Sequence, residues 1–223
     1  MKKILFICFG LFIVIGIVTS PSAKELEIQG KRLVSQKPPF ALVVPSEFRF
    51  VHSFSHENPG ENSLTRGYFF VKSEGKEMEE MLIVQISDKT NPQGAPMTLP
   101  PLKPYTEKRL YAKEKMKKGD VEGEHLVQLM AWNPEAPSLQ PLLKKGIRIP
   151  SHWALQGQFQ FNYVGEHAVS FRYSKDVRSF GMMVSDDGKQ WEKELLSGNE
   201  RKVYDSFRKS FMEMIRSIEV RNP

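Results

Sequence analysis

The sequence contains a single cysteine among 223 residues, and this residue, Cys8, lies in an apolar stretch near the N-terminus. A disulfide framework, a cysteine nucleophile and a cysteine-ligated metal are therefore excluded for the rest of the chain. Glycine and proline together account for 30 residues, which is close to average usage, so no large low-complexity region is expected. Hydrophobic residues at 40% and charged residues at 26% are typical of a folded globular protein, not of a disordered or multi-span membrane chain.

The motifs of several enzyme classes are also missing. The sequence has no G-x-G-x-x-G or G-K-[ST] loop for phosphate binding, and no G-x-S-x-G nucleophile elbow. His125, His152 and His167 are scattered, and no motif links any of them to Ser170 or Ser179. A serine hydrolase is therefore not expected, and no cofactor is predicted.

His52 and His56 are the one histidine pair with a spacing that occurs in metal sites. On a helix, a spacing of four would place both imidazoles on one face for zinc. Alternating residues favour a strand instead, with Phe48, Phe50, His52 and Phe54 on one face. On a strand the two histidines would lie about 13 Å apart, so no metal site is predicted.

Two short acidic motifs are interpreted as surface features. The pairs Glu79-Glu80 and Asp186-Asp187 are expected to be exposed, since adjacent residues do not supply the carboxylate geometry of a glycosidase. The string SDDGKQW at 185–191 is similar to the Asp-box turn of sialidase-like propellers, but it is one residue shorter and occurs once. It is predicted to be a hairpin turn and not a sugar site.

The N-terminus carries the three parts of a secretory signal peptide. Lys2 and Lys3 precede a run of 15 apolar residues and glycines, Ile4–Val18, which is followed by small residues. The run is shorter than the roughly 20 residues needed to span a bilayer. We expect residues 1–23 to be the signal peptide, with cleavage after Ser22 or Ala23. An uncleaved inner-membrane anchor is the alternative. Cleavage after Ala23 would reduce the formal charge from +6 to +4.

The remaining residues, 24–223, are predicted to form a single α+β domain with a mainly antiparallel twisted sheet and a packed C-terminal amphipathic helix. Short apolar runs separated by turn residues predict strands, and runs at 68–71, 81–86 and 126–132 indicate strands buried on both faces. Proline-rich loops are expected near 89–106 and 133–152. Residues 106–118 fit either a helix or a lysine-rich edge strand.

The C-terminal helix is predicted from seven large residues that recur at spacings of three and four, namely Val203, Tyr204, Phe207, Phe211, Met214, Ile215 and Ile218. Ser197 and Glu200 have the spacing of a capping box at its start.

A hairpin is predicted at 158–173, and its register can be tested on the sequence. A three-residue loop would pair Tyr163 with His167 and Phe161 with Val169, which aligns the two aromatic rows on one face. A two-residue loop would require both faces of the sheet to be covered, which fits the many strands that are apolar on both faces. The sequence leaves the two loops open.

The strongest concentration of charge lies at 103–118, where seven basic and two acidic residues give a local charge of +5. This stretch is a candidate contact with an anionic surface such as phospholipid or lipopolysaccharide. The lysines also suit an edge strand that resists edge-to-edge association. The candidate contact residues are Lys108, Arg109, Lys113, Lys115, Lys117 and Lys118.

Two segments resemble the PsbP-like family of small exported accessory proteins of photosystems and their bacterial relatives. Residues 40–48, FALVVPSEF, are similar to the opening strand of that family, and residues 214–220, MIRSIEV, to its closing helix. The resemblance implies an antiparallel sheet flanked by helices and a non-catalytic role in binding a partner. It carries over no functional residue.

These observations predict an exported, non-catalytic binding or accessory protein of the cell envelope, periplasmic or extracellular. The expected partner is a protein or an envelope component, and nucleic acid is not expected. The alternatives are an envelope hydrolase with a site assembled from dispersed residues, and a domain tethered by an uncleaved anchor.

Overall fold

The computed structural model describes residues 26–29 and 31–221, so the expected signal peptide lies outside the described residues. The strands are β1 (Leu26–Gln29), β2 (Arg32–Gln36), β3 (Pro39–Val43), β4 (Arg49–Asn58), β5 (Ser63–Glu74), β6 (Glu77–Lys89), β7 (Tyr111–Lys118), β8 (Val121–Ala131), β9 (Trp153–Tyr163), β10 (His167–Asp176) and β11 (Glu219–Val220). The helices are α1 (Gln140–Lys144) and α2 (Gly198–Arg216), with short 3-10 turns η1 (Pro59–Glu61), η2 (Pro137–Leu139), η3 (Val177–Phe180) and η4 (Lys189–Trp191).

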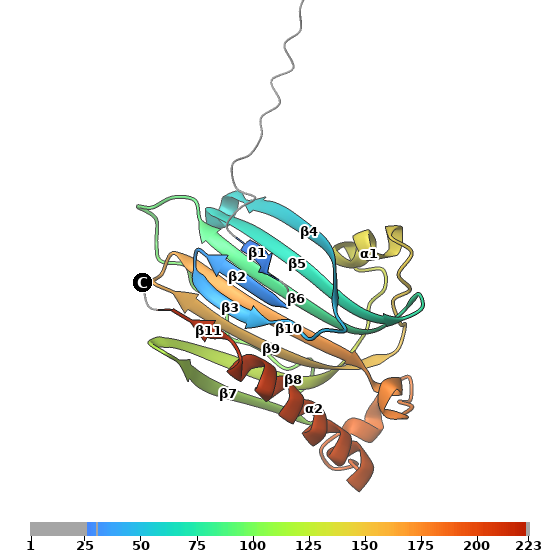
Figure 1. The fold of residues 1–223 in the computed structure, drawn as a ribbon. Helices are drawn as coiled ribbons and strands as arrows, with labels where there is room; N and C mark the ends of the chain where they lie inside the picture. Colours follow the sequence, from blue (N-terminus) through green and yellow to red (C-terminus); the bar gives the residue numbers. More distant parts are fainter. Residues whose placement is uncertain (1–25, 30, 222–223) are drawn as a thin grey trace, which may run out of the picture.

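Two antiparallel sheets make up most of the fold, which is mainly β with a C-terminal helix. The larger sheet has seven strands in the order β4-β5-β6-β10-β9-β8-β7, and the smaller has the order β1-β2-β3-β11. The small sheet and α2 both cover one face of the large sheet (Figure 1). A second apolar cluster lies on the other face, where α1 and the residues around it cover β5 and β6.

Strands β5 and β6 therefore carry apolar residues on both faces, as their continuous hydrophobic runs predict. Phe70 and Leu82 belong to the cluster beneath α2 and the small sheet, while their neighbours Phe69 and Ile83 belong to the cluster near α1. Strands buried on both faces lose the usual alternation between apolar and polar residues.

The predicted C-terminal helix is confirmed. Tyr204, Phe207, Phe211 and Ile215 are all buried against the large sheet. Ser197 accepts a hydrogen bond from the backbone N–H of Asn199 at 3.2 Å and so caps the first turn. The reciprocal half of the predicted capping box is wrong, since Glu200 Oε2 is buried without a hydrogen-bond partner among the described residues.

Of the two alternatives for the hairpin, the structure has the three-residue loop, although both faces of the sheet are also covered. Tyr163 pairs with His167, and Phe161 pairs with Val169. The loop residue Val164 adopts a left-handed conformation with φ of 55°, followed by Gly165 at 69°. The aromatic rows of β9 and β10 thus share one face and stack beneath α2 and the small sheet.

The expectation that Phe48, Phe50, His52 and Phe54 share one face is wrong. A β-bulge between Phe50 and His52 inserts one residue into β4. Since side chains alternate along a strand, one extra residue moves all later side chains to the opposite face. Phe50 consequently packs on Phe70, whereas Phe54 packs on Phe69 across the sheet.

Of the two interpretations of 106–118, the edge strand is correct from Tyr111 onward, because β7 forms one edge of the large sheet. Residues 90–110 contain no helix and connect β6 to β7 as a loop, as predicted. The loop prediction for 133–152 is only partly right, since this stretch contains η2 and α1. Both begin with a proline in the first turn, where its missing N–H is tolerated.

The string at 185–191 is not a hairpin turn, because it contains η4 and no named strand lies directly before or after it. Asp187 accepts hydrogen bonds from Ser185 Oγ at 2.8 Å and from the Lys189 backbone N–H at 3.2 Å. These bonds to the ionised carboxylate lower the pKa of Asp187 to about 2. The turn places Trp191 in the core, where it is fully buried.

Helix α2 crosses β9 at a glycine, which generates a test of the packing. A Cβ atom at Gly157 would collide with the ring of Phe211. We expect Gly157→Ala to lower the free energy of unfolding by about 1–3 kcal/mol through overpacking. Phe211→Ala should lower it by about 3–5 kcal/mol through the cavity that it leaves.

Urea unfolding of the double variant provides the decisive measurement, because the extra methyl can occupy part of that cavity. The loss of unfolding free energy in the double variant should be clearly smaller than the sum of the losses in the two single variants. Gly60→Ala is the control, since nothing lies within 4 Å of a Cβ atom at that position. Strict additivity would contradict the predicted contact.

Candidate functional site

A hollow of about 410 Å³ lies where the small sheet, α2 and the large sheet meet. The β3–β4 connection and α2 form its walls, and strands β5, β6 and β10 contribute to its floor. The walls are mainly apolar, with Val43, Pro45, Phe48 and Met214. The polar lining residues are Glu47, Lys72, Glu80, Tyr173, Ser210 and Ser217.

A row of charged side chains crosses three neighbouring strands at this floor. Glu80 on β6 is the register partner of Lys72 on β5 and of Lys175 on β10. Tyr173 lies two residues before Lys175 and so projects from the same face. The β-ladder therefore brings a carboxylate between two ammonium groups and beside a phenol.

The Glu80 carboxylate is 5% exposed and has partners at both oxygens. Oε2 accepts a hydrogen bond from the Tyr173 hydroxyl at 2.6 Å. Oε1 lies 3.1 Å from Nζ of Lys72 and 3.1 Å from Nζ of Lys175. Both oxygens of a buried charge are thus satisfied, which is the condition for keeping a carboxylate ionised inside a protein.

The electrostatics of the row fix the protonation states of its members. Burial by itself would raise the pKa of Glu80, but the hydrogen bond from Tyr173 and the two lysines outweigh it and hold that pKa below the ordinary value of 4.5. Burial and the adjacent carboxylate raise the pKa of Tyr173 far above its ordinary value. The hydrogen bond to Glu80 raises the pKa of Lys72.

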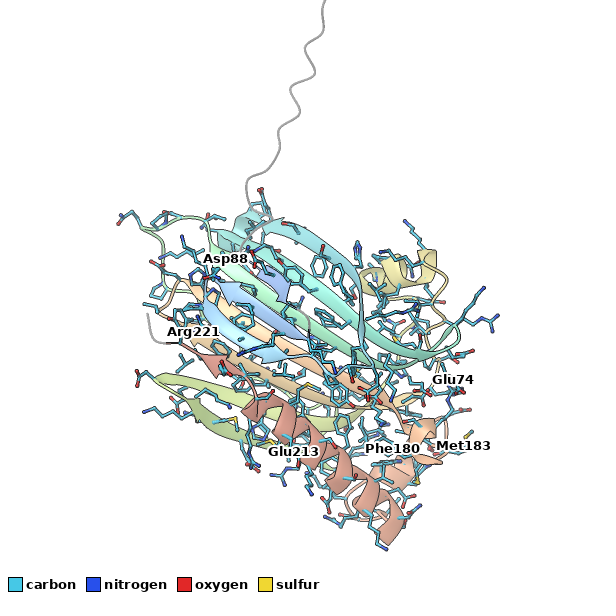
Figure 2. All side chains as sticks on the ribbon, viewed as in Figure 1. Glu74, Asp88, Phe180, Met183, Glu213 and Arg221 are labelled. Carbon is cyan, nitrogen blue, oxygen red and sulfur yellow. The ribbon has the colours of Figure 1, made fainter. Side chains whose placement is uncertain are left out.

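A second charged cluster lies at the other end of the same face. Asp88 accepts hydrogen bonds from Arg66 on β5 and from Nδ1 of His167 on β10, the latter at 2.7 Å. Figure 2 shows Asp88 at the opposite end of the large sheet from Glu74 in the β5–β6 turn. Arg66 is buried, and the small sheet packs over this face.

The sequence analysis missed the Glu80 row. It predicted that Glu79 and Glu80 are both exposed, and this is wrong for Glu80. Asp186 and Asp187 are exposed as expected. Glu80 lies directly before the apolar run 81–86, in phase with Leu82 and Val84 of the core face, which is the signal that could have indicated its burial.

The six candidate cations of the anionic-surface prediction are gathered along β7 and the segment before it, but four of them already contact other groups. Lys113 donates to the Leu102 carbonyl at 2.6 Å and lies 3.3 Å from Glu124. Lys115 forms an exposed ion pair with Glu122 at 3.6 Å.

The other two of these four cations, Arg109 and Lys118, contact groups within the fold. The guanidinium of Arg109 lies 4.2 Å from the ring centroid of Trp153 and donates to the Asp187 carbonyl. Lys118 donates to the Arg216 carbonyl at the end of α2, and burial lowers its pKa. Lys108 and Lys117 are exposed, and the contact with an anionic surface stays a prediction.

The histidines are not brought together. His52 and His56 both lie on β4, as the strand interpretation predicts. Ser170 Oγ bonds to Gln85 and Ser179 Oγ to the Asp176 carbonyl, so neither serine is paired with a histidine. Within residues 26–29 and 31–221, no group of three or more His, Cys, Asp or Glu side chains is placed to hold a metal ion.

No known family model matches the chain, and neither a curated protein nor a solved structure is significantly similar to it. In the described part of the chain, no helix is both long and apolar enough to cross a membrane.

Glu80 should contribute to stability in a pH-dependent way. Glu80→Gln leaves Lys72 and Lys175 without their shared carboxylate, and we expect a loss of about 1–3 kcal/mol at pH 7. Because the pKa of Glu80 is lower in the folded state, its ionisation stabilises the fold fully above the unfolded value of 4.5. That contribution disappears as the pH falls through the folded pKa.

Urea unfolding between pH 7 and pH 3 measures this difference directly. The gap between wild type and Glu80→Gln should stay constant above about pH 5 and shrink below it. Glu79→Gln is the control, since Glu79 is only partly buried and lies 4.0 Å from Lys72. A gap that persists unchanged at pH 3 would show that charge is not the cause.

Proposed function

We propose that this protein is an exported, non-catalytic binding protein of the cell envelope, and that the hollow beside α2 is its ligand site. The observation that carries the proposal is the combination of apolar walls with a charged floor whose members are already paired. A volume of about 410 Å³ is within the usual range for small-molecule sites.

The electrostatics of the floor favour binding over acid–base chemistry. A general acid or base works best with a pKa near the operating pH. Glu80 has a lowered pKa, and Tyr173 and Lys72 have raised ones, so each is held in one protonation state near neutrality. Such groups orient a ligand without exchanging protons with it.

The lining indicates an amphipathic ligand with an uncharged polar group. Phe48 and Met214 offer apolar contact along the walls, while Lys72 and the serine hydroxyls offer hydrogen bonds. A second hollow of about 180 Å³ lies on the other side of Pro45 and Phe48 and includes the half-exposed Phe50, so the apolar surface continues there. Glu47 and Glu80 beside Lys72 disfavour a free anion in the first hollow.

The envelope location is supported by the sequence of residues 1–23, and the partner-binding role of PsbP-like proteins is compatible with a site of this kind. Contact of Lys108 and Lys117 with an anionic surface would hold the protein near a membrane.

Export predicts a specific change in mass. Protein recovered from the envelope fraction of its native cells should begin at Ala23 or Lys24, because the small residues after Val18 suit signal peptidase. Intact-mass measurement with N-terminal sequencing checks this. Recovery of the full-length chain in the inner membrane would favour the anchored alternative.

Blocking the hollow should abolish ligand binding. We expect the fluorescence of N-phenyl-1-naphthylamine, an uncharged apolar probe, to rise as it binds the wild-type domain. Ser210→Phe adds a large side chain to an exposed position of α2 that lines the hollow, and should weaken binding by at least about tenfold, equivalent to about 1.4 kcal/mol.

Ser206→Phe is the matched control, because Ser206 is exposed on the same helix and does not line the hollow. It should bind the probe like the wild type. Equal affinities for all three proteins, or no binding by the wild type, would refute this site.

A further inference from the structure

Arg172 lies on β10 and faces away from α2. Its neighbours Phe171 and Tyr173 belong to the core beneath α2 and the small sheet, so alternation along the strand places Arg172 on the opposite face. It is partly buried there, and the loss of water around its guanidinium lowers its pKa.

The strand positions next to Arg172 on its face carry no carboxylate. Its register partners are Ile83 on β6 and Gln158 on β9. The next positions on the same face are Met81, which is apolar, and five residues with amides or hydroxyls, namely Gln85, Gln156, Gln160, Ser170 and Ser174. Glu124 on β8 lies further away and accepts a hydrogen bond from Gln160 at 3.2 Å. Among the described residues, Arg172 forms no ion pair.

Arg172 differs in this respect from five other arginines of the described chain. These contact a carboxylate, in the pairs Arg32–Glu219, Arg66–Asp88, Arg148–Glu77, Arg178–Asp176 and Arg208–Glu114. A partly buried guanidinium without a counter-ion is costly, and such a group is retained where something else supplies the negative charge.

One edge of the Arg172 guanidinium is hydrogen-bonded to Gln158, and the other edge has no further hydrogen-bond partner within the described residues. With its amide oxygen turned toward the guanidinium, Gln158 accepts hydrogen bonds from Nε at 2.8 Å and from Nη2 at 3.3 Å. This leaves the end-on edge formed by Nη1 and Nη2. No nitrogen of Arg172 is both unpaired and sealed from solvent, in contrast to Nη1 of Arg109, so Nη1 of Arg172 is in contact with solvent.

We propose that Arg172 and the amides around it form a binding site for a small oxyanion, either a carboxylate or a phosphate group. The free edge of a guanidinium presents two parallel N–H groups, which match two oxygens of such an anion. Gln85 and Gln156 lie at its periphery, where Gln85 accepts a hydrogen bond from Ser170 Oγ at 3.4 Å and Gln156 donates one to Ser174 Oγ at 3.2 Å. The site is separate from the hollow beside α2, because it lies on the other face of the sheet.

The test is thermal unfolding of the mature domain at pH 7 in inorganic phosphate or in acetate, with sodium chloride at matched ionic strength as the reference. We expect one of the two anions to raise the Tm of the wild type saturably at millimolar concentration. Which anion does so assigns the site to phosphate or to carboxylate. Arg172→Met should lose this response and should be at least as stable as the wild type in chloride.

Arg172→Lys keeps the charge without the paired N–H groups and should bind at least about tenfold more weakly than the wild type. Arg178→Met is the control, because Arg178 already pairs with Asp176 and should not affect the response. As a second readout on the wild type, the Nε–Hε resonance of Arg172, assigned by its absence in Arg172→Lys, should shift saturably with the anion.

Three results would overturn the proposal. The first is the absence of any saturable response to either anion in the wild type. The second is an equal response in Arg172→Met. The third is a clear loss of stability of Arg172→Met in chloride, which would show that Gln158 already compensates the charge and that the arginine is structural.

Discussion

Strand β6 carries an acidic residue near each end, and each is held between groups from the two neighbouring strands. Glu80 lies between Lys72 and Lys175, and Asp88 contacts Arg66 and His167. From Met81 to Val84 β6 is apolar on both faces. A one-residue slip of a strand that is apolar on both faces would leave the hydrophobic pattern satisfied, so that pattern specifies register weakly. The ionic contacts at the two ends specify the register, since a slip would bury charged groups without their partners.

The same contacts explain why the candidate binding site is placed where it is. The Glu80 row cannot be covered completely by apolar side chains, because the two lysines need partial access to water. The small sheet and α2 cover the apolar middle of the face and leave a hollow above this end. The residues that fix the register of β5, β6 and β10 therefore also form the polar floor of the hollow.

The sequence predicts those elements whose pattern depends only on the periodic burial of apolar side chains along one segment. The α2 stripe follows from periodicity alone, whereas periodicity leaves two loop lengths open for the β9–β10 hairpin. The faces of β4 could not be predicted, since the bulge after Phe50 depends on pairing with β5 and leaves no local signal. Most of the candidate site was missed for the same reason, because Lys72, Glu80 and Tyr173 are distant in sequence and meet only through the ladder. Charge counts also do not show which cations already have partners, and several lysines of β7 contact groups on other elements.

The buried charge on one face of the large sheet is fully paired, whereas the charge on the other face is not. This difference indicates which kind of ligand is expected on each face. Beneath α2 the carboxylate of Glu80 has three partners, so an added ion would have to displace one of them. Uncharged groups that extend the existing hydrogen bonds fit there better. On the other face the guanidinium of Arg172 has a single amide partner and retains an unused edge. Strand β10 connects the two, since Tyr173 and Arg172 are adjacent on it with opposite orientation. A substitution at either residue that displaces β10 would therefore affect the proposed binding sites on both faces, although the two side chains make no contact with each other.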